Sequence, residues 1–445
     1  MTRPMKDSGI EWIGEIPQGW SISKVKRFFE TTLGKMLQPN PKNDNEELRD
    51  YLCSANITWG GIDLSSIKKM WFSPNEKEHY RLKTGDLLVT EGGDVAVSCP
   101  WNGELDECYI QNAIHRVRSH EGSSNKFLYY LLYTLKHSGY IDLICNKATI
   151  AHFTKEKLGE TPFIVCGFDE QVAISNFLDF KCAQVDRVIA SKQNSNELLK
   201  EHRQSIIYEA VTKGLDRNAP MKDSGIEWIG KIPLEWEVKR TKYLFDVVNG
   251  ATPRSGNSEY WEGCIPWVTP ADFVTDRKYI PEPRKYITEK GLNSCGTRLV
   301  PEGSIIVSNR APIGSIAVAA FQLCTNQGCK SLVRKGDLCP EYYYYFLSVM
   351  GSVLNGFGKG TTFLELSSSD LGGFYLPVPM IEEQQAISDY LGEKCGEIDR
   401  LIQANNFTIE KLIEYRQSII FEAVTGKMEV PKNCLALSQV LEAQL

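Results

Sequence analysis

The chain has 445 residues, enough for two to four domains, and 42% of them are hydrophobic, which supports packed cores rather than disorder. No stretch approaches ~18 uninterrupted apolar residues, and the first twelve residues lack the apolar segment of a secretory signal. The 13 cysteines form no C-x-x-C pair, which argues against zinc clusters and disulfide frameworks and favours reduced thiols. We therefore expect a cytoplasmic protein without a membrane span. The formal net charge of −6 taken alone argues against a nucleic-acid partner.

The sequence is one unit written twice. The ten residues MKDSGIEWIG occur at 5–14 and again at 221–230. Further along, residues 169–212 match residues 382–425 without a gap, and RQSII and EAVT are identical in both copies. We therefore divide the chain into a globular domain over 1–157, a helical spacer over 158–220, a globular domain over 221–370, and a second helical spacer with the tail over 371–445.

The first globular domain shows short β-rich segments broken by Gly, such as 85–98, followed by an apolar helical stretch at 127–144. The second domain repeats this order with 303–320 and 342–355. Sequence identity between the two domains is low, so each is predicted to be an α/β domain that has diverged from the other. The fold class predicted for the whole chain is α+β with an internal pseudo-two-fold repeat.

Both repeated segments are predicted to be long helices that pair with each other as an antiparallel coiled coil. No Gly or Pro interrupts 170–212, and apolar residues recur every seven positions. The residues of this seam are Leu178, Val185, Leu199 and Ile206 in the first copy and Leu391, Ile398, Leu412 and Ile419 in the second. Lys192 and Asn405 fill the missing positions, and polar core residues of this kind can fix register.

A second seam is predicted from Ile174, Val188 and His202, matched by Ile387, Leu401 and Tyr415. The alternative is that each helix packs only against its own half of the chain. The tryptophans of the repeated start, Trp12, Trp20, Trp228 and Trp236, are predicted to pack each globular domain onto its helix.

Charge is distributed unevenly along the chain. Residues 1–157 hold 20 basic and 20 acidic side chains, and 221–370 hold 17 and 16, whereas 158–220 hold 7 and 9 and 371–445 hold 6 and 11. The acidic excess therefore belongs to the helical regions, which should repel phosphate and suit a protein partner.

Catalytic motifs are missing. The sequence has no G-x-x-x-x-G-K-[ST] loop, no Asn/Asp-Pro-Pro-aromatic tetrad and no pair of histidines at metal-ligand spacing. We expect no catalytic residue, no metal and no cofactor.

The repeated SGIEWIGEIPQGW and SGIEWIGKIPLEW, the RQSII…EAVT helices and the two divergent domains resemble the specificity subunit of type I restriction–modification enzymes. The segment LGGFYLPVPMIEEQQAI at 371–387 resembles the family's proline-flanked helix entry, and the first copy keeps Glu170-Gln171 without the paired prolines. The resemblance implies two target-recognition domains that each read one half of a bipartite, asymmetric double-stranded DNA sequence. It also implies that the helices set the spacer and dock two methyltransferase subunits, with restriction subunits as further partners.

Residues that could read DNA are polar side chains in loops of both domains. The candidates in the first domain are Thr90, Gln111, Asn112, His115, Arg116, Arg118, Lys147 and Thr149, and those in the second are Asn309, Arg310, Asn326, Gln327, Lys330, Lys359, Thr361 and Thr362. Two other readings stay open: a coiled-coil scaffold for protein interactions that does not bind DNA, and an enzyme whose active site has no familiar motif.

Overall fold

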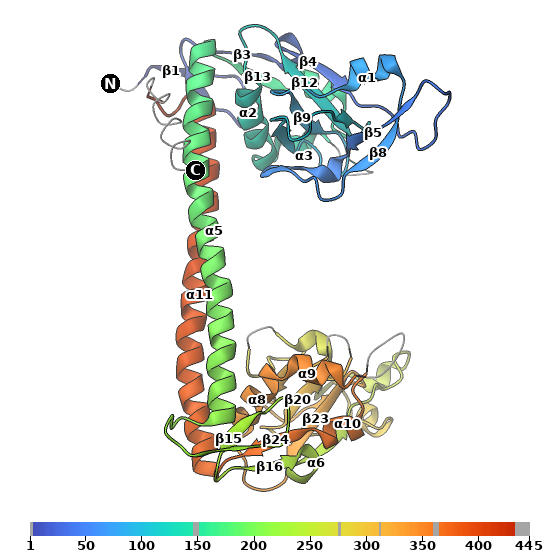
Figure 1. The fold of residues 1–445 in the computed structure, drawn as a ribbon, viewed down its shortest axis with the longest axis vertical. Coiled ribbons are helices and arrows are strands. Elements are labelled where there is room, and N and C mark those ends of the chain that lie inside the picture. The colour runs from blue at the N-terminus through green and yellow to red at the C-terminus, as the bar shows by residue number, and fades with distance from the viewer. Residues whose placement is uncertain (1–2, 146–150, 275–276, 311–312, 359–364, 432–445) are drawn as a thin grey trace. The chain divides into compact units, whose positions relative to one another are not determined.

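The computed structural model describes residues 3–145, 151–274, 277–310, 313–358 and 365–431, which divide into two units. The first unit joins residues 1–192 to residues 407–445, and the second is the continuous stretch 193–406. Each unit contains one globular domain, the start of one long helix and the end of the other (Figure 1). None of the helices in the described part of the chain is long and apolar enough to cross a bilayer.

In the described residues, the globular domain of the first unit is built from short strands and short helices. Its strands are β1 (Met5–Asp7), β2 (Glu15–Pro17), β3 (Ser21–Lys24), β4 (Phe29–Leu33), β5 (Glu47–Leu52), β6 (Ile57–Thr58), β7 (Gly61–Ile62), β8 (Lys68–Phe72), β9 (Leu87–Thr90), β10 (Ser98–Pro100), β11 (Tyr109–Ile110), β12 (Ile114–Ser119) and β13 (Pro162–Val165). Its helices are α1 (Pro74–Tyr80), α2 (Asn125–His137), α3 (Tyr140–Ile144) and α4 (Lys155–Glu160), and the long helix α5 (Phe168–Lys213) follows.

The second unit repeats most of this order, although its described residues hold no counterpart of the β6–β7 pair. Its strands are β14 (Met221–Asp223), β15 (Lys231–Pro233), β16 (Glu237–Arg240), β17 (Phe245–Asn249), β18 (Trp261–Val268), β19 (Tyr286–Ile287), β20 (Ile305–Ser308), β21 (Ile316–Val318), β22 (Cys324–Thr325), β23 (Cys329–Arg334) and β24 (Tyr375–Val378). Its helices are α6 (Thr241–Leu244), α7 (Glu289–Asn293), α8 (Pro340–Val349), α9 (Gly351–Gly356) and α10 (Ser368–Gly373), and the long helix α11 (Ile381–Val424) follows.

The two domains share one sheet topology although their sequences differ. The four-stranded sheet of the first domain has the order β10-β9-β12-β4, and that of the second has the matching order β21-β20-β23-β17. The three-stranded sheets also match, because β5 pairs parallel with β11 and antiparallel with β8, as β18 does with β22 and β19. This correspondence assigns each residue of one sheet a partner position in the other.

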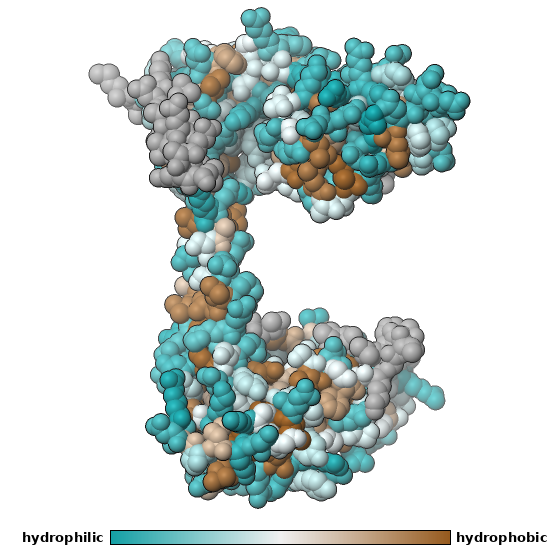
Figure 2. Space-filling model, viewed as in Figure 1, coloured by the Kyte–Doolittle hydropathy of each residue, from teal (hydrophilic) through white to brown (hydrophobic). Residues whose placement is uncertain are grey.

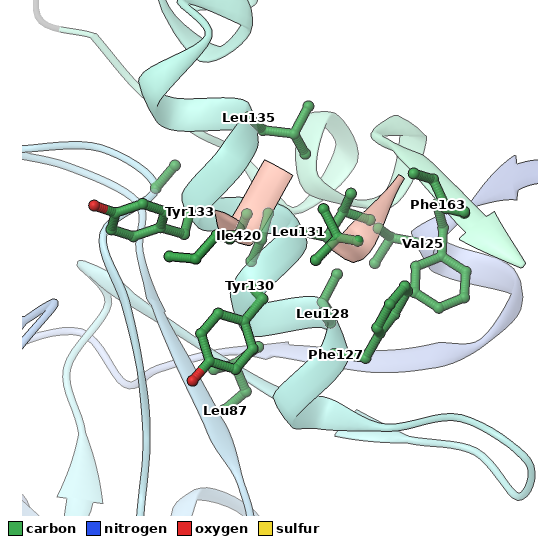
Figure 3. Packing of buried hydrophobic residues seen from close by; sticks show 14 of the residues in the cluster. Val25, Leu87, Phe127, Leu128, Tyr130, Leu131, Tyr133, Leu135, Phe163 and Ile420 are labelled. Atoms are coloured by element: carbon green, nitrogen blue, oxygen red, sulfur yellow. The ribbon is translucent and has the colours of Figure 1, made fainter. Parts of the chain in front are cut away.

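The core of the first domain lies between the four-stranded sheet, α2 and the long helices. Phe127, Leu128 and Leu131 of α2 are fully buried and belong to one cluster with Leu87 of β9 and Ile420 of α11 (Figure 3). A buried side chain from the end of the chain thus completes a core that begins in the first strands. In the second domain, Tyr342 of α8 donates a hydrogen bond of 2.9 Å to the carbonyl oxygen of Val211 in α5.

The long helices pair antiparallel, as predicted. In the first unit Arg416 of α11 lies 2.6 Å from the Asp186 carboxylate of α5, and in the second unit Arg203 of α5 lies 3.3 Å from that of Asp399 in α11. The seam residues Leu178, Val185, Leu391, Ile398 and Ile419 are buried, and Leu199, Ile206 and Leu412 are half-buried.

The second predicted seam is wrong beyond its first position. Ile174 and Ile387 are buried, but Val188, Leu401 and Tyr415 are exposed, and so is His202. Apolar patches among polar ones are visible along the helices (Figure 2). Two packed helices bury only one stripe each, so the flanking stripe reaches solvent wherever no globular domain covers it.

Three asparagines bond across the pair in the second unit, of which Asn196 is buried, Asn405 half-buried and Asn406 exposed. The Asn196 side chain is buried and donates 2.8 Å to the Asn406 amide oxygen, while it accepts 2.9 Å from the Asn405 Nδ2. The predicted polar core position at Asn405 is thus part of an amide ladder between the helices.

The repeated start and the Glu-Gln pair are joined by the same bonds in both units. The indole nitrogen of Trp20 donates 2.8 Å to Glu170, and that of Trp236 donates 2.8 Å to Glu383. Gln171 in turn accepts from the backbone nitrogen of Ser124 at 3.0 Å, which is the cap of α2. These bonds tie each domain to the first turn of its helix, as predicted for Trp20 and Trp236. Trp12 instead packs against Tyr140, and Trp228 packs against Phe357 and Phe374.

Candidate nucleic-acid interface

One end of the four-stranded sheet gathers the polar loops in each domain. In the first domain β4 ends, β9 ends and β12 begins at this end, and β17, β20 and β23 do the same in the second. The strand registers match His115 to Lys330 and Thr90 to Ser308. Several residues predicted from loop composition therefore occupy equivalent positions, which the low sequence identity had hidden.

A turn that carries two neighbouring amides precedes β12 and β23. Gln111 and Asn112 form this turn in the first domain, and Asn326 and Gln327 form it in the second. The Gln111 side chain donates a hydrogen bond of 2.7 Å to the Asn112 side chain. The Asn326 side chain accepts a hydrogen bond of 2.9 Å from the Gly328 nitrogen, and the Gln327 side chain accepts one from the Thr252 hydroxyl. The turns are partly or fully exposed, so their amides can meet a ligand.

A glycine holds each amide turn against the preceding strand. A Cβ added at Gly34 would lie 2.4 Å from the carbonyl oxygen of Gln111, and one at Gly250 would lie 1.9 Å from that of Asn326. Only glycine permits this approach, because real side chains do not come so close to a backbone oxygen. Both glycines directly follow a strand, Gly34 after β4 and Gly250 after β17, so they occupy the same position in the two domains.

The residue after β9 or β20 differs in charge between the domains. In the first domain the residue after β9 is Glu91, and desolvation by burial raises its pKa. In the second domain the residue after β20 is Asn309, whose Nδ2 donates a hydrogen bond of 3.1 Å to Glu365. The guanidinium of Arg310 lies 3.4 Å from the same carboxylate. Arg310 is exposed and remains a candidate for a DNA contact.

Other candidates lie in the interior of the domains. His115 is 0% exposed, its Nε2 lies 2.9 Å from the Phe153 carbonyl oxygen, and burial lowers its pKa to about 4. Arg116 is buried and donates to the carbonyl oxygens of His79 and Arg81 at 2.7 and 3.1 Å. The Thr90 hydroxyl donates 2.6 Å to the Asp94 carbonyl oxygen. In this structure these three side chains bond within the first domain, and their predicted DNA contacts stay predictions.

In the second domain Asn309 and Lys330 are also buried, and Lys330 donates 2.9 Å to Asn249. Burial lowers the pKa of Lys330. The backbone nitrogen of Asn309 also donates a 3.0 Å hydrogen bond to the Gly328 carbonyl oxygen of the amide turn, and the DNA contacts predicted for both residues stay predictions. Arg118 sits at the far end of β12 and pairs with Asp86 at 2.6 Å, so the structure does not bring it to the amide turn. Lys147, Thr149, Lys359, Thr361 and Thr362 lie outside the described residues.

Within the described ranges, no group of three or more His, Cys, Asp or Glu side chains could hold a metal ion. The gathered groups are amides, a guanidinium and backbone atoms. Such groups recognise hydrogen-bonding edges of a ligand.

Comparison with known proteins identifies one family of similar proteins. The model of the type I restriction modification DNA specificity domain matches residues 17–201 and 233–414. The type I restriction enzyme MjaIX specificity subunit of Methanocaldococcus jannaschii is 41% identical over 166 residues, which are 37% of this chain and 38% of the relative. The putative MjaX specificity subunit of the same organism is 24% identical over 436 residues, covering 94% of this chain and 96% of the relative.

Two solved structures share the fold. A chain from a study of complex assembly and conformational transition of the type I R-M system has a TM-score of 0.72 at 19% identity and covers 93% of this chain and 99% of its own length. The HsdS subunit from Thermoanaerobacter tengcongensis has a TM-score of 0.52 at 19% identity, with coverage of 93% and 98%.

Proposed function

The chain belongs to the type I restriction modification DNA specificity family, and on this premise we propose that it is the non-catalytic DNA-recognition subunit of a type I complex. Each globular domain, over 1–157 and 221–370, reads one half of a bipartite double-stranded target. The observation that supports this is a shared sheet topology with different side chains at equivalent loop positions. Two unlike readers on one repeated frame suit a target whose halves differ.

The amide turns are the proposed centre of each reading surface. Gln and Asn side chains can form two hydrogen bonds with N6 and N7 of adenine, and an arginine can do the same with O6 and N7 of guanine. Gln111 and Asn112 would serve the first half-site, and Asn326, Gln327 and Arg310 the second. The buried Thr90, His115, Arg116, Asn309 and Lys330 would hold these loops in place.

The paired helices are the proposed spacer and docking surface for two methyltransferase subunits, with restriction subunits joining the same complex. Half-sites on one face of B-DNA are separated by about one turn, ~34 Å, which a pair of long helices can span. Exposed apolar side chains on both helices, Val188 and Leu198 on α5 and Leu401, Phe407 and Tyr415 on α11, suit a protein partner. The acidic excess of these regions agrees, since it disfavours contact with phosphate.

The test compares DNA methylation in cells with and without the gene. We expect one bipartite motif to lose methylation when the gene is removed, and the purified chain with its methyltransferase partner to shift a duplex that carries this motif. A chain that assembles with its partner but shifts no DNA would instead support the scaffold function.

A further inference from the structure

An exposed apolar pair, Met36 and Leu37, follows β4 in the first domain after Gly34 and Lys35. Met36 and Leu37 are 75% and 57% exposed, whereas the residues on either side, Lys35 and Gln38, are 5% and 7% exposed. Two large apolar side chains are thus held in solvent between two buried polar ones. This reverses the usual distribution and points to a ligand that covers the apolar pair.

Both buried neighbours are anchored by hydrogen bonds. The Lys35 ammonium donates a hydrogen bond of 2.7 Å to the Trp71 carbonyl oxygen and one of 2.5 Å to the Glu76 carboxylate. The side-chain amide of Gln38 donates a 2.6 Å hydrogen bond to Glu46, and the backbone carbonyl oxygen of Gln38 accepts a 3.1 Å hydrogen bond from the Trp71 nitrogen. The position of the apolar pair is therefore fixed from both ends, so a ligand would meet it without first ordering a loop.

The apolar pair adjoins the amide turn. The nitrogen of Lys35 donates 3.0 Å to the Ile110 carbonyl oxygen, and the nitrogen of Asn112 donates 2.9 Å to the carbonyl oxygen of Lys35. Met36 thus follows directly on the residue that is bonded to the turn of Gln111 and Asn112. Amides match the hydrogen-bonding edge of adenine, and apolar side chains match the 5-methyl group of its partner thymine.

The second domain lacks this feature at the equivalent position. Thr252, Pro253 and Arg254 follow β17 there, and Pro253 is buried while the other two are exposed. The Thr252 hydroxyl bonds to Gln327 of the amide turn. The surface beside the second amide turn is therefore polar, and the second domain serves as an internal reference.

We propose that Met36 and Leu37 contact thymine 5-methyl groups in the major groove of the first half-site, beside adenines bound by Gln111 and Asn112. The inference rests on the proposed function and adds the base that the first domain recognises. It predicts that the first half-site contains A·T pairs whose thymine methyl groups contribute to affinity, and that the second domain makes no such contact through residues 252–254.

The test uses the full chain with its methyltransferase partner and a duplex that carries the methylated motif. Each thymine is replaced in turn by deoxyuridine, which removes only the methyl group. At one or more positions of the first half-site we expect the affinity to fall about fourfold per methyl, which corresponds to ~0.8 kcal/mol for one buried carbon. The double variant Met36→Ser/Leu37→Ser should bind the thymine and uracil duplexes equally.

Leu234→Ser, which removes an equally exposed leucine from the second unit, is the matched control and should keep the wild-type difference between the two duplexes. The inference is overturned if the double variant retains that difference, or if no thymine of the first half-site responds to uracil. The inference is also overturned if the complex increases the fluorescence of 2-aminopurine in the duplex while it binds the thymine and uracil duplexes with equal affinity. Such an increase indicates that the apolar pair inserts between bases. If the wild-type complex does not bind the motif at all, the proposed function itself is overturned.

Discussion

His115 and Lys330 occupy the same position in the two four-stranded sheets, and burial lowers the pKa of both bases. The His115 ring lies against the Phe153 carbonyl oxygen, and the Lys330 ammonium donates a hydrogen bond to Asn249. The two domains thus keep a buried basic side chain at one sheet position, although one is an imidazole and the other an ammonium group.

The buried His115 should make the stability of the first unit depend on pH. The folded state holds the imidazole neutral down to about pH 4, whereas an unfolded histidine binds a proton near pH 6.5. Between these values the unfolded state binds more protons, so the free energy of unfolding falls as the pH is lowered. We expect a loss of roughly 2–3 kcal/mol between pH 7 and pH 4.5, measured by urea unfolding. His115→Gln, which does not titrate, should lack this part of the loss; equal losses in both chains would contradict the assignment.

The close approach at Gly250 gives a second prediction at this scale. Gly250→Ala places a Cβ against the carbonyl oxygen of Asn326, so the amide turn must move. We expect a loss of ~1–3 kcal/mol in the free energy of unfolding and weaker binding of the second half-site. Gly256→Ala is the control, because no atom lies within 4 Å of its added Cβ. Unchanged DNA affinity in Gly250→Ala would remove the turn from the interface.

Sequence reasoning identified the polar loops but not the burial of individual residues within them. His115 and Arg116 lie in a strand whose polar letters suggested a surface, and only the packing of α1 and of the segment around Phe153 against that strand encloses them. The exposure of Met36 and Leu37 was not predicted for the opposite reason, because apolar residues after a strand suggest a core. Burial depends on contacts between segments distant in sequence, which periodicity does not contain.

At the scale of elements, the long helices were predictable to within a few residues, because an uninterrupted heptad pattern does not depend on the rest of the fold. The predicted stretch 170–212 compares with α5 at Phe168–Lys213. The error in the second seam, at Val188 and Leu401, arose because heptad spacing gives the period of a stripe and not what covers it.

The asparagine ladder should fix the alignment of the two helices. Asn196→Leu removes two hydrogen bonds between the helices and leaves the amides of Asn405 and Asn406 without these partners. We expect a loss of ~1–2 kcal/mol in the free energy of unfolding, since each bond contributes about 0.5–1.5 kcal/mol. Asn194→Leu, the same change at an exposed position, is the control and should be nearly neutral. A more stable Asn196→Leu chain would contradict a stabilising role of these hydrogen bonds.

At the scale of the whole molecule, the repeated frame should make the domains exchangeable. We expect replacement of residues 221–378 by the corresponding part of another family member to change one half of the methylated motif and leave the other half intact. The boundary at 378 keeps β24 with β16, which it pairs along its length. Methylation sequencing provides the measurement, and a motif altered in both halves would contradict independent reading.

The two units differ in how their residues are distributed along the chain, because the second is one continuous segment and the first needs residues 407–428 to cover Ile174, Phe177 and Leu178. During synthesis on the ribosome the second unit has all its residues once Asn406 has emerged, while the first waits for the final helix. A premature stop within α11 would therefore leave apolar surface from the beginning of the protein open to chaperones and proteases.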